Sequence, residues 1–251
     1  MENVELSVAI ITKNEEVNLP VCLESVAFAS DIVVVDSGST DRTVEIAKMA
    51  GCRIYVEEWK GFGPQKNSAI EKCLYDWVLV IDADERVPEV TQRRILEILK
   101  NPTADAYSFK RKNYFHGKWL RFGDAWPDRQ VRLINRRKGY FRGPIHERWI
   151  TSGRVIDLPE YIEHFSFKNY SEMLKTLDEY STITAHELFK QGKNLNTLTP
   201  LIHASIMFFR LYLLRFGFLD GFDGFIMALL KALGSFFKYA KLRELYLLKE
   251  D

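Results

Sequence analysis

Trp77-Val78-Leu79-Val80-Ile81-Asp82-Ala83-Asp84 decides the fold of this 251-residue chain, because an apolar run ends there in two carboxylates. A short run that is apolar on both faces and rich in β-branched residues predicts a strand buried in a parallel sheet. Such sheets bind ligands at the carboxyl ends of their strands. Alternation along an extended chain would place Asp82 and Asp84 on one side, about 7 Å apart, where they could share a divalent cation. Taken alone, the pair could equally be an ordinary acidic loop.

Two other apolar runs end in polar residues in the same way. Residues 6–11 lead into Thr12-Lys13-Asn14-Glu15, and residues 32–35 lead into Asp36-Ser37-Gly38-Ser39. Because the carboxyl ends of parallel strands meet at one edge of a sheet, we expect all three polar clusters to lie side by side. This agreement favours a ligand site over three unrelated loops.

Short apolar runs alternate with helical patterns over the first hundred residues, which predicts a parallel α/β sheet. A helix capped by Thr40 or Asp41 is closed by Gly51, another opens at Pro88 and Glu89, and a third covers 170–190. Strands are predicted at 6–11, 32–35, 53–56, 77–81, 106–109, 131–134 and 155–165. We predict a catalytic domain over 1–168, divided into 1–100 and 101–168, followed by a helical region over 169–251.

Composition indicates a globular protein, since 47% of the residues are hydrophobic. The overall charge of +1 identifies no partner, but residues 110–142 carry eleven Lys or Arg against two Asp, which indicates an anionic partner. Cys22, Cys52 and Cys73 lack the spacing of a disulfide frame or metal site and predict buried thiols in a reducing compartment. The acidic start of the chain predicts no signal peptide, hence the cytosol.

The tail is unusually apolar. Residues 201–219 and 225–239 are nearly continuous apolar sequence around a turn at 217–224. Arg210 and Arg215 disfavour a membrane span, because each would cost about 2.5 to 3.5 kcal/mol at a helix centre. Six Lys or Arg against two Asp between 199 and 243 instead predict an interfacial membrane hairpin over 199–248. The alternative is a helical pair packed on the catalytic domain or in a dimer.

Together with Gly63-Pro64-Gln65-Lys66-Asn67, these motifs resemble glycosyltransferase family 2 over about residues 6–100. Trp126-Pro127-Asp128, Ile145-His146-Glu147 and Asp220-Gly221 resemble, more narrowly, bacterial lipopolysaccharide core heptose β-glucosyltransferases. The resemblance implies the GT-A fold, a mostly parallel sheet flanked by helices. It also implies a divalent metal, Mg²⁺ or Mn²⁺, held by Asp84 with Asp82 and His164, although His164 could instead be a buried, hydrogen-bonded histidine. The implied nucleotide-sugar-binding residues are Thr12, Asn14, Glu15, Asp36, Ser39, Lys66, Asp82 and Ala83.

An inverting transfer needs a base for the acceptor hydroxyl. Glu147 is the first choice and Asp128 the second. Each has a plain alternative as an ion-pair partner, Glu147 of Arg148 and Asp128 of Arg129 or Arg132.

The sequence therefore predicts an inverting, metal-dependent hexosyltransferase that moves glucose, as first choice, from UDP-glucose to a lipopolysaccharide inner-core sugar or similar anionic glycolipid. The basic, aromatic segment 110–142 then fits a sugar acceptor better than nucleic acid. The expected location is peripheral, on the cytoplasmic face of the bacterial inner membrane. A polyprenyl-phosphate glycosyltransferase and a non-enzymatic, membrane-bound sugar-nucleotide sensor are the alternatives, and the oligomeric state is not predicted.

Overall fold

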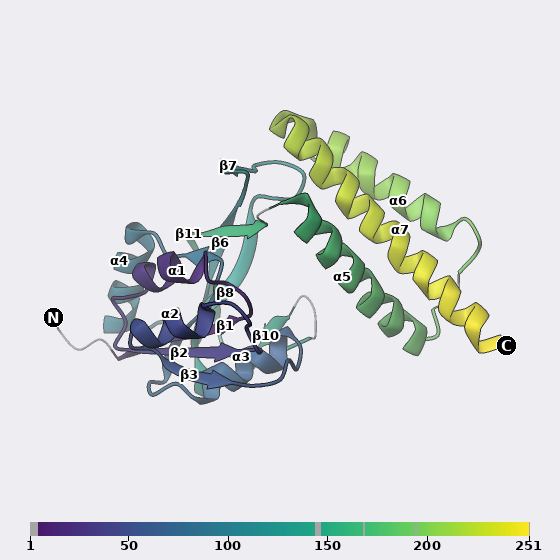
Figure 1. Cartoon of the computed structure of the whole chain (residues 1–251). Helices are drawn as coiled ribbons and strands as arrows, with labels where there is room; N and C mark the ends of the chain where they lie inside the picture. Colours follow the sequence, from purple (N-terminus) through teal and green to yellow (C-terminus); the bar gives the residue numbers. More distant parts are fainter. Residues whose placement is uncertain (1–4, 144–146, 168, 194, 251) are drawn as a thin grey trace. The chain divides into compact units, whose positions relative to one another are not determined.

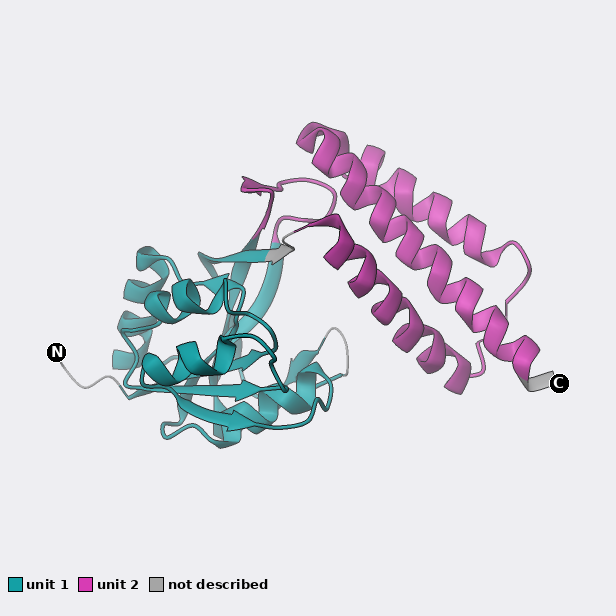
Figure 2. Cartoon of the chain, in the orientation of Figure 1, with its two compact units in different colours: residues 1–112, 128–165 teal, residues 113–127, 166–251 magenta. Residues whose placement is uncertain are grey.

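The computed structural model describes residues 5–143, 147–167, 169–193 and 195–250 (Figure 1). The chain divides into two compact units (Figure 2). The first comprises Met1–Lys112 and Asp128–Phe165, and the second comprises Asn113–Pro127 and Ser166–Asp251. Residues 113–127 thus group with the helical region, whereas the sequence placed them in the acceptor half of the catalytic domain.

The first unit contains a mixed sheet. Its parallel half has the order β3-β2-β1-β4, and an antiparallel strand, β8, pairs with β4. β6 pairs antiparallel with β8 and is followed by β11 and the short β5. The strands are β1 (Leu6–Thr12), β2 (Asp31–Asp36), β3 (Arg53–Val56), β4 (Trp77–Asp82), β5 (Glu85–Arg86), β6 (Ala106–Phe115), β8 (Asp128–Asn135) and β11 (Val155–Phe167).

The predicted α/β fold class is confirmed, with a larger antiparallel part than a mostly parallel sheet implies. Parallel neighbours need a crossover, and helices α1 (Leu19–Ser25), α2 (Thr43–Met49) and α3 (Phe62–Glu71) supply it between the first four strands. After α4 (Glu89–Lys100), no α-helix separates the described strands up to β11, so β8 can pair antiparallel with β4 and β6. A separate antiparallel pair is formed by β9 (Tyr140–Arg142) and β10 (Arg148–Ile150).

Two buried clusters lie on the two faces of this sheet. All seven residues of β1 are buried, and they alternate between the clusters: Val8 and Ile10 pack in one, Ala9 and Ile11 in the other. The first cluster includes side chains of α1, α2 and α4, and the second includes those of α3. Burial on both faces explains the continuous apolar runs of the parallel strands.

The second unit is mainly helical. Its helices are α5 (Tyr170–Lys190), which coincides with the predicted helix, α6 (Thr199–Phe209) and α7 (Phe222–Glu250). A π-helical turn at Arg210–Leu214 and a 3-10 turn at Gly217–Asp220 connect α6 to α7. Residues 113–127 contribute β7 (Lys118–Trp119), which pairs with the last residues of β6. No described helix is both long and apolar enough to cross a membrane.

Candidate active site

The register of the sheet brings the three predicted polar strand ends together. Thr12 at the end of β1 is opposite Asp36 on β2, and Ile11 is opposite Asp82 on β4. The carboxyl ends of β1, β2 and β4 therefore form one edge, as expected for parallel strands. The polar residues that follow them lie in loops at that edge.

The first two loops brace each other. The Asp36 carboxylate accepts hydrogen bonds from the backbone N–H groups of Gly38 at 3.0 Å and Ser39 at 2.8 Å, and from the Ser39 hydroxyl. The Asn14 N–H donates to Ser39 Oγ at 2.8 Å, and the Glu15 N–H donates to Thr43 Oγ1 at 2.7 Å. Gly38 has φ of +82° with open space beside its Cα, so its backbone conformation and its exposure both suit a loop that borders a ligand.

Asp41 also helps to join these two loops. Its carboxylate accepts hydrogen bonds from the Thr43 N–H at 3.0 Å and from the Glu16 N–H at 3.2 Å. The helix begins at Thr43, so the cap that the sequence assigned to Thr40 or Asp41 acts from just outside the helix. Burial raises the pKa of Asp41, but the hydrogen bonds from Thr43 outweigh that effect and lower it from its ordinary value.

Asp82 lies between two buried cations. Its Oδ1 is 2.8 Å from Lys66 Nζ on α3, and its Oδ2 is 2.7 Å from Arg132 Nη2 on β8. Lys66 is 1% exposed and also lies 2.6 Å from Glu147 Oε1. Lys66 therefore connects Asp82 at the sheet edge with the first-choice base.

A second set of contacts extends this arrangement through the buried Glu85. Glu85 Oε1 lies 2.5 Å from Arg132 Nη2 and 3.6 Å from Arg111 Nη1 on β6. Arg111 in turn lies 2.6 Å from Asp128 Oδ2. We call the resulting series of alternating charges the ion chain, and its members in order are Glu147, Lys66, Asp82, Arg132, Glu85, Arg111 and Asp128.

The ion chain shifts the pKa values of three of its members, Asp82, Arg132 and Arg111, toward their charged forms. Burial raises the pKa of Asp82, but the charges of Lys66 and Arg132 outweigh it and hold that pKa well below its usual range. For Arg132, burial lowers the pKa, yet Glu85 and Asp82 raise it far above its ordinary value. The pKa of Arg111 is raised in the same way by Glu85 and Asp128, against burial. The site thus holds full charges out of bulk water, where electrostatic interactions are strong.

Three buried polar atoms at this edge have no hydrogen-bond partner among the described residues. They are Thr12 Oγ1, Asp82 Oδ1 and Arg132 Nε, of which Asp82 Oδ1 lies 2.8 Å from the Lys66 ammonium. Buried polar atoms in folded proteins are normally hydrogen-bonded, so each such atom calls for an explanation. A bound polar ligand would be such an explanation, since it could exchange a hydrogen bond with the Thr12 hydroxyl and accept one from Arg132 Nε.

Asp84 has a different environment from Asp82. The sequence argument assumed that the chain stays extended, but Ala83 and Asp84 form a turn after β4, so that geometry is wrong. Asp84 Oδ2 lies 3.3 Å from His164 Nε2 on β11, and Ala83 is buried in the core. Burial raises the pKa of Asp84, while the His164 charge and hydrogen bond lower it, with a net decrease.

The predicted metal ligands fit a divalent ion only in part. Among the described residues, no group of three or more His, Cys, Asp or Glu side chains is placed to hold a metal. Asp84 and His164 lie together and supply oxygen and nitrogen, whereas Asp82 is engaged by two cations. Mg²⁺ in enzymes commonly takes one or two carboxylates and completes its shell with substrate phosphates and water, so a two-residue protein set is compatible with such an ion.

The two candidate bases lie at opposite ends of the ion chain. Glu147 pairs with Lys66, and Asp128 pairs with Arg111 and also accepts from Gln130 Nε2 at 2.9 Å. The sequence suggested Arg148 as the partner of Glu147 and Arg129 or Arg132 as the partner of Asp128, whereas the structure pairs these acids with Lys66 and Arg111. Residues 144–146, which include Ile145 and His146 of the sequence motif, lie outside the described residues.

Sequence reasoning missed three members of the ion chain, Glu85, Arg111 and Arg132. Arg132 is the one with a recognisable signal, because it interrupts the apolar pattern Val131-Arg132-Leu133 of a buried strand. Arg111 and Arg132 belong to the basic segment that the sequence assigned to an anionic partner, and both already have carboxylate partners within the protein.

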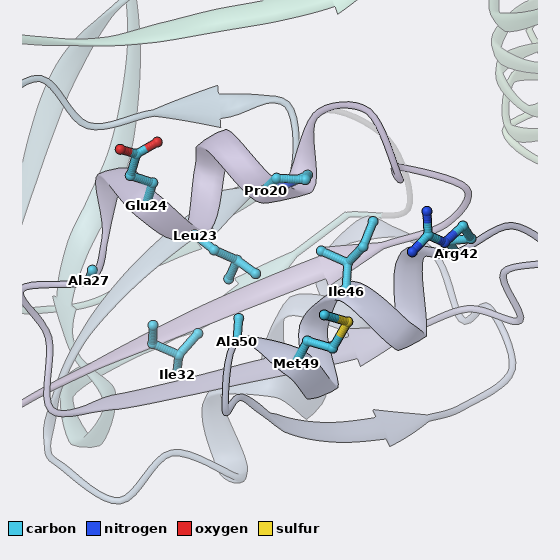
Figure 3. A pocket seen from close by; sticks show the side chains of 9 residues that line it. All are labelled: Pro20, Leu23, Glu24, Ala27, Ile32, Arg42, Ile46, Met49 and Ala50. Atoms are coloured by element: carbon cyan, nitrogen blue, oxygen red, sulfur yellow. The ribbon is translucent and has the colours of Figure 1, made fainter.

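A pocket of about 530 Å³ lies elsewhere, between α1 and α2 (Figure 3). Its lining is mainly apolar and includes Leu23, Ile32, Ile46 and Met49. None of the predicted site residues lines it. The chemistry of the protein is therefore better sought at the sheet edge.

The ion chain should be important for stability. Replacing the buried Arg132 by methionine leaves Glu85 and Asp82 each without one cation, and we expect the free energy of unfolding to fall by about 3 to 5 kcal/mol. Urea unfolding followed by circular dichroism measures this change. Arg42→Met is the control, since the Arg42–Glu45 pair is well exposed and should leave the unfolding midpoint nearly unchanged. Equal midpoints for Arg132→Met and the unmodified chain would contradict a stabilising role of the ion chain.

The fold is that of an α/β protein, with a candidate site for a polar ligand at the carboxyl ends of its parallel strands. The family described as Glycosyl transferase family 2 matches residues 7–155, and the chain belongs to this family. The predicted family and the predicted enzyme class are thereby confirmed: the protein is a glycosyltransferase.

Two similar proteins span nearly the whole chain. An uncharacterized glycosyltransferase of Rickettsia typhi is 32% identical over 97% of this chain and 88% of its own length. The lipopolysaccharide core biosynthesis glycosyltransferase LpsC of Rhizobium meliloti is 32% identical over 97% of this chain and 94% of its own length.

Solved structures are more distant. TarS of S. aureus (residues 1–349), in complex with UDP-GlcNAc, is 16% identical, with a TM-score of 0.47, over 92% of this chain and 81% of that one. Glucosyl-3-phosphoglycerate synthase of Mycobacterium tuberculosis, in complex with Mn²⁺, UDP and glucosyl-3-phosphoglycerate, is 22% identical, with a TM-score of 0.37, over 43% of this chain and 44% of that one.

Proposed function

We propose that this glycosyltransferase moves a hexose, glucose from UDP-glucose as first choice, with inversion and with a divalent metal, onto an anionic inner-core sugar of lipopolysaccharide. The acceptor class is supported by the similarity to LpsC over nearly the full length of both chains. The observation that carries the proposal is the sheet edge itself. It combines the Asp84–His164 pair with the buried cations Lys66 and Arg132.

The donor would lie across the three loops at this edge. Thr12, Asn14, Glu15, Asp36, Ser39 and Ala83 are the proposed residues around the nucleoside. The buried Thr12 Oγ1 and Arg132 Nε provide hydrogen-bonding capacity that no described residue uses. Lys66 and Arg132 would stabilise the negative charge that develops as the nucleoside diphosphate leaves.

Asp84 and His164 would hold the metal. Bound there, Mg²⁺ or Mn²⁺ would supply further positive charge to the departing diphosphate. Asp82 stays ionised because of Lys66 and Arg132, and we propose that it orients these cations or accepts from the ribose. Glu147 is the proposed base for the acceptor hydroxyl.

A second candidate function is glycosyl transfer to a polyprenyl phosphate. One observation favours it: both candidate bases, Glu147 and Asp128, are engaged in ion pairs. A phosphate acceptor is already ionised and needs no base, so these pairs could then be permanent.

A product screen separates these functions. Purified full-length protein is given UDP-hexoses and Mg²⁺ or Mn²⁺, with truncated lipopolysaccharides or polyprenyl phosphates as acceptors, and products are identified by mass. We expect one added hexose on an inner-core acceptor. Transfer to the polyprenyl phosphate alone would establish the second function. Donor binding with neither transfer nor hydrolysis would instead indicate a sensor.

We also propose that the enzyme works at a membrane surface, as a peripheral protein on the cytoplasmic side. Its acceptor would be a membrane glycolipid, and the helical region over 199–248 is apolar and cationic. The contacts of that region suggest how this attachment is built.

A further inference from the structure

One side of α6 and the turn after it is apolar and exposed. Ile202, Ile206 and Phe209 follow one another at helical spacing, and Leu214, Phe216 and Phe222 continue the surface around the turn to α7. These six side chains, which we call the apolar face, are between 47 and 73% exposed. A group of exposed apolar side chains on adjoining elements is typical of a docking site for a protein or a membrane.

The charges near the apolar face are mainly positive. From Thr199 to Arg243 the chain has six Lys or Arg and two acids, Asp220 and Asp223. Asp220 is buried, and Asp223 lies near His116 and Lys118. Arg210 and Arg215, both at least half exposed, share the single carboxylate of Asp124, at 2.7 and 3.1 Å.

This charge pattern favours a bilayer over a second copy of the chain. Two copies joined through the apolar face would bring their Arg210 and Arg215 side chains together, and like charges so placed are unfavourable. An anionic phospholipid surface attracts these side chains and accepts the apolar ones.

The segment 113–127 is fastened to the same turn. The buried carboxylate oxygen Oδ2 of Asp220 accepts hydrogen bonds from the N–H groups of Arg121 and Phe122, each at 2.9 Å. The Lys118 ammonium donates to the Asp220 carbonyl oxygen, and the Gly123 N–H donates to the Arg215 carbonyl oxygen at 3.0 Å. Residues near both ends of the turn, Arg215 and Asp220, thus accept hydrogen bonds from the backbone of the segment.

The turn has little freedom to change shape. A Cβ added to Gly224 would lie 1.9 Å from the Gly217 carbonyl oxygen, and one added to Gly217 would lie 2.7 Å from the Leu211 carbonyl oxygen. These backbones are therefore in direct contact, and a rigid turn can position what is bound to it.

The segment itself carries residues suited to a membrane interface. Trp119 and Trp126 pack edge to face with ring centroids 5.2 Å apart, and the Arg121 guanidinium lies 4.4 Å from the Trp119 ring centroid. Trp side chains are enriched at the boundary between lipid and water. The Nε1 atom of Trp119 is buried, so the exposed Arg121 is the polar part of this cluster that faces solvent.

We propose that the apolar face docks on an anionic phospholipid bilayer, and that Asp220 holds the segment 113–127 at that membrane surface. The inference rests on the proposed function only in expecting a membrane acceptor. The segment joins β6 to β8, the strands that carry Arg111 and Asp128. A segment fixed in this way would meet the head group of a membrane glycolipid.

Vesicle binding of the full-length protein tests the docking. Sucrose-loaded vesicles of phosphatidylcholine with phosphatidylglycerol should sediment the protein at low salt, and vesicles of phosphatidylcholine alone should bind it much less. The combined change Ile206→Ser, Leu214→Ser and Phe222→Ser should weaken binding at least about tenfold. Leu174→Ser with Ile183→Ser is the control, since these exposed apolar residues lie on α5, outside the region 199–248.

Three results would overturn the docking proposal. The first is unchanged vesicle binding by the triple variant, and the second is no binding by the unmodified chain. The third is that the triple variant loses a dimer in light scattering but keeps vesicle binding, because a second copy would then cover the apolar face. The assay needs neither donor nor acceptor, so failure of the proposed transfer reaction would be seen separately in the product screen.

Hydrogen exchange of the full chain tests the role of Asp220. Asp220→Ala removes the acceptor, and we expect the Arg121 and Phe122 amides to exchange at least about tenfold faster. Asp220→Asn keeps a side-chain oxygen and should retain most of the protection. Equal amide exchange in Asp220→Ala and the unmodified chain would overturn the proposed attachment. So would an equal loss of amide protection in both variants that extends throughout α6 and α7, because it would indicate unfolding of the unit.

Discussion

Replacing Asp84 by asparagine is expected to lower the rate of hexose transfer at least about a hundredfold, the usual effect of removing one strong electrostatic contact from a transition state. The substitution keeps the shape of the side chain and removes its charge. Asp84 is the carboxylate that lies 3.3 Å from His164, and its lowered pKa keeps it ionised. If this pair holds the metal, the variant should also need more Mg²⁺ or Mn²⁺ to reach its own maximal rate.

The rate is measured on the acceptor found in the product screen, across a titration of metal. Asp76→Asn is the control, because Asp76 is more exposed than Asp84, pairs with Arg137 and is not one of the proposed donor-site residues. It should transfer at the normal rate. Unchanged turnover of Asp84→Asn, or full activity of the unmodified enzyme in excess chelator, would refute the proposed metal role of Asp84.

Local sequence pattern predicted the parallel half of the sheet well. β1, β2, β3 and β4 each have the predicted position within one residue. For β1, β2 and β4 the reason is that strands buried on both faces are continuous apolar runs, whereas β3 lies at the sheet edge and is only partly buried. A helix between the third and fourth strands was expected, but its bounds were not assigned, because the buried face of α3 mixes the polar Gln65, Lys66 and Ser68 with the apolar Ala69 and Ile70. Of these, Lys66 contacts Asp82 and Glu147 at the candidate site, so function and helical periodicity conflict at that residue.

The site shows the same limit. Strand ends that follow apolar runs located Thr12, Asp36 and Asp82, since adjacency in a parallel sheet follows from the fold class. The pairing of Arg132 with Asp82 and Glu85 depends instead on β8 lying antiparallel beside β4. Such contacts join residues about 50 positions apart, and no local pattern encodes them.

The turn at Ala83 and Asp84 illustrates how a small error in backbone geometry changes a chemical interpretation. An extended chain would make Asp82 and Asp84 equivalent metal ligands. With the turn, Asp82 contacts Lys66 and Arg132, and Asp84 contacts His164. The two acids therefore have different proposed roles.

The largest effect on turnover is expected from Glu147→Gln. If Glu147 takes the proton of the acceptor hydroxyl, kcat should fall by about 10² to 10⁴, the usual contribution of a general base. Glutamine can still accept a hydrogen bond from Lys66, so donor binding should be nearly normal. In the structure Glu147 is held by Lys66, and we expect the donor diphosphate to draw the Lys66 ammonium away and free the carboxylate for catalysis.

Asp128→Asn is the matched comparison, because Asp128 ends the same ion chain at the other side. Its carboxylate is held by Arg111 at 2.6 Å and by Gln130, an arrangement that suits a structural ion pair. We expect this variant to lose stability while keeping kcat within about tenfold of normal, in contrast to the loss expected when a base is removed. Stopped assays for kcat and calorimetry for donor binding separate the two effects. A large loss of kcat in Asp128→Asn alone would assign the base to Asp128. Near-normal kcat in both variants would favour an acceptor that is already ionised, as a polyprenyl phosphate is, because such an acceptor needs no base.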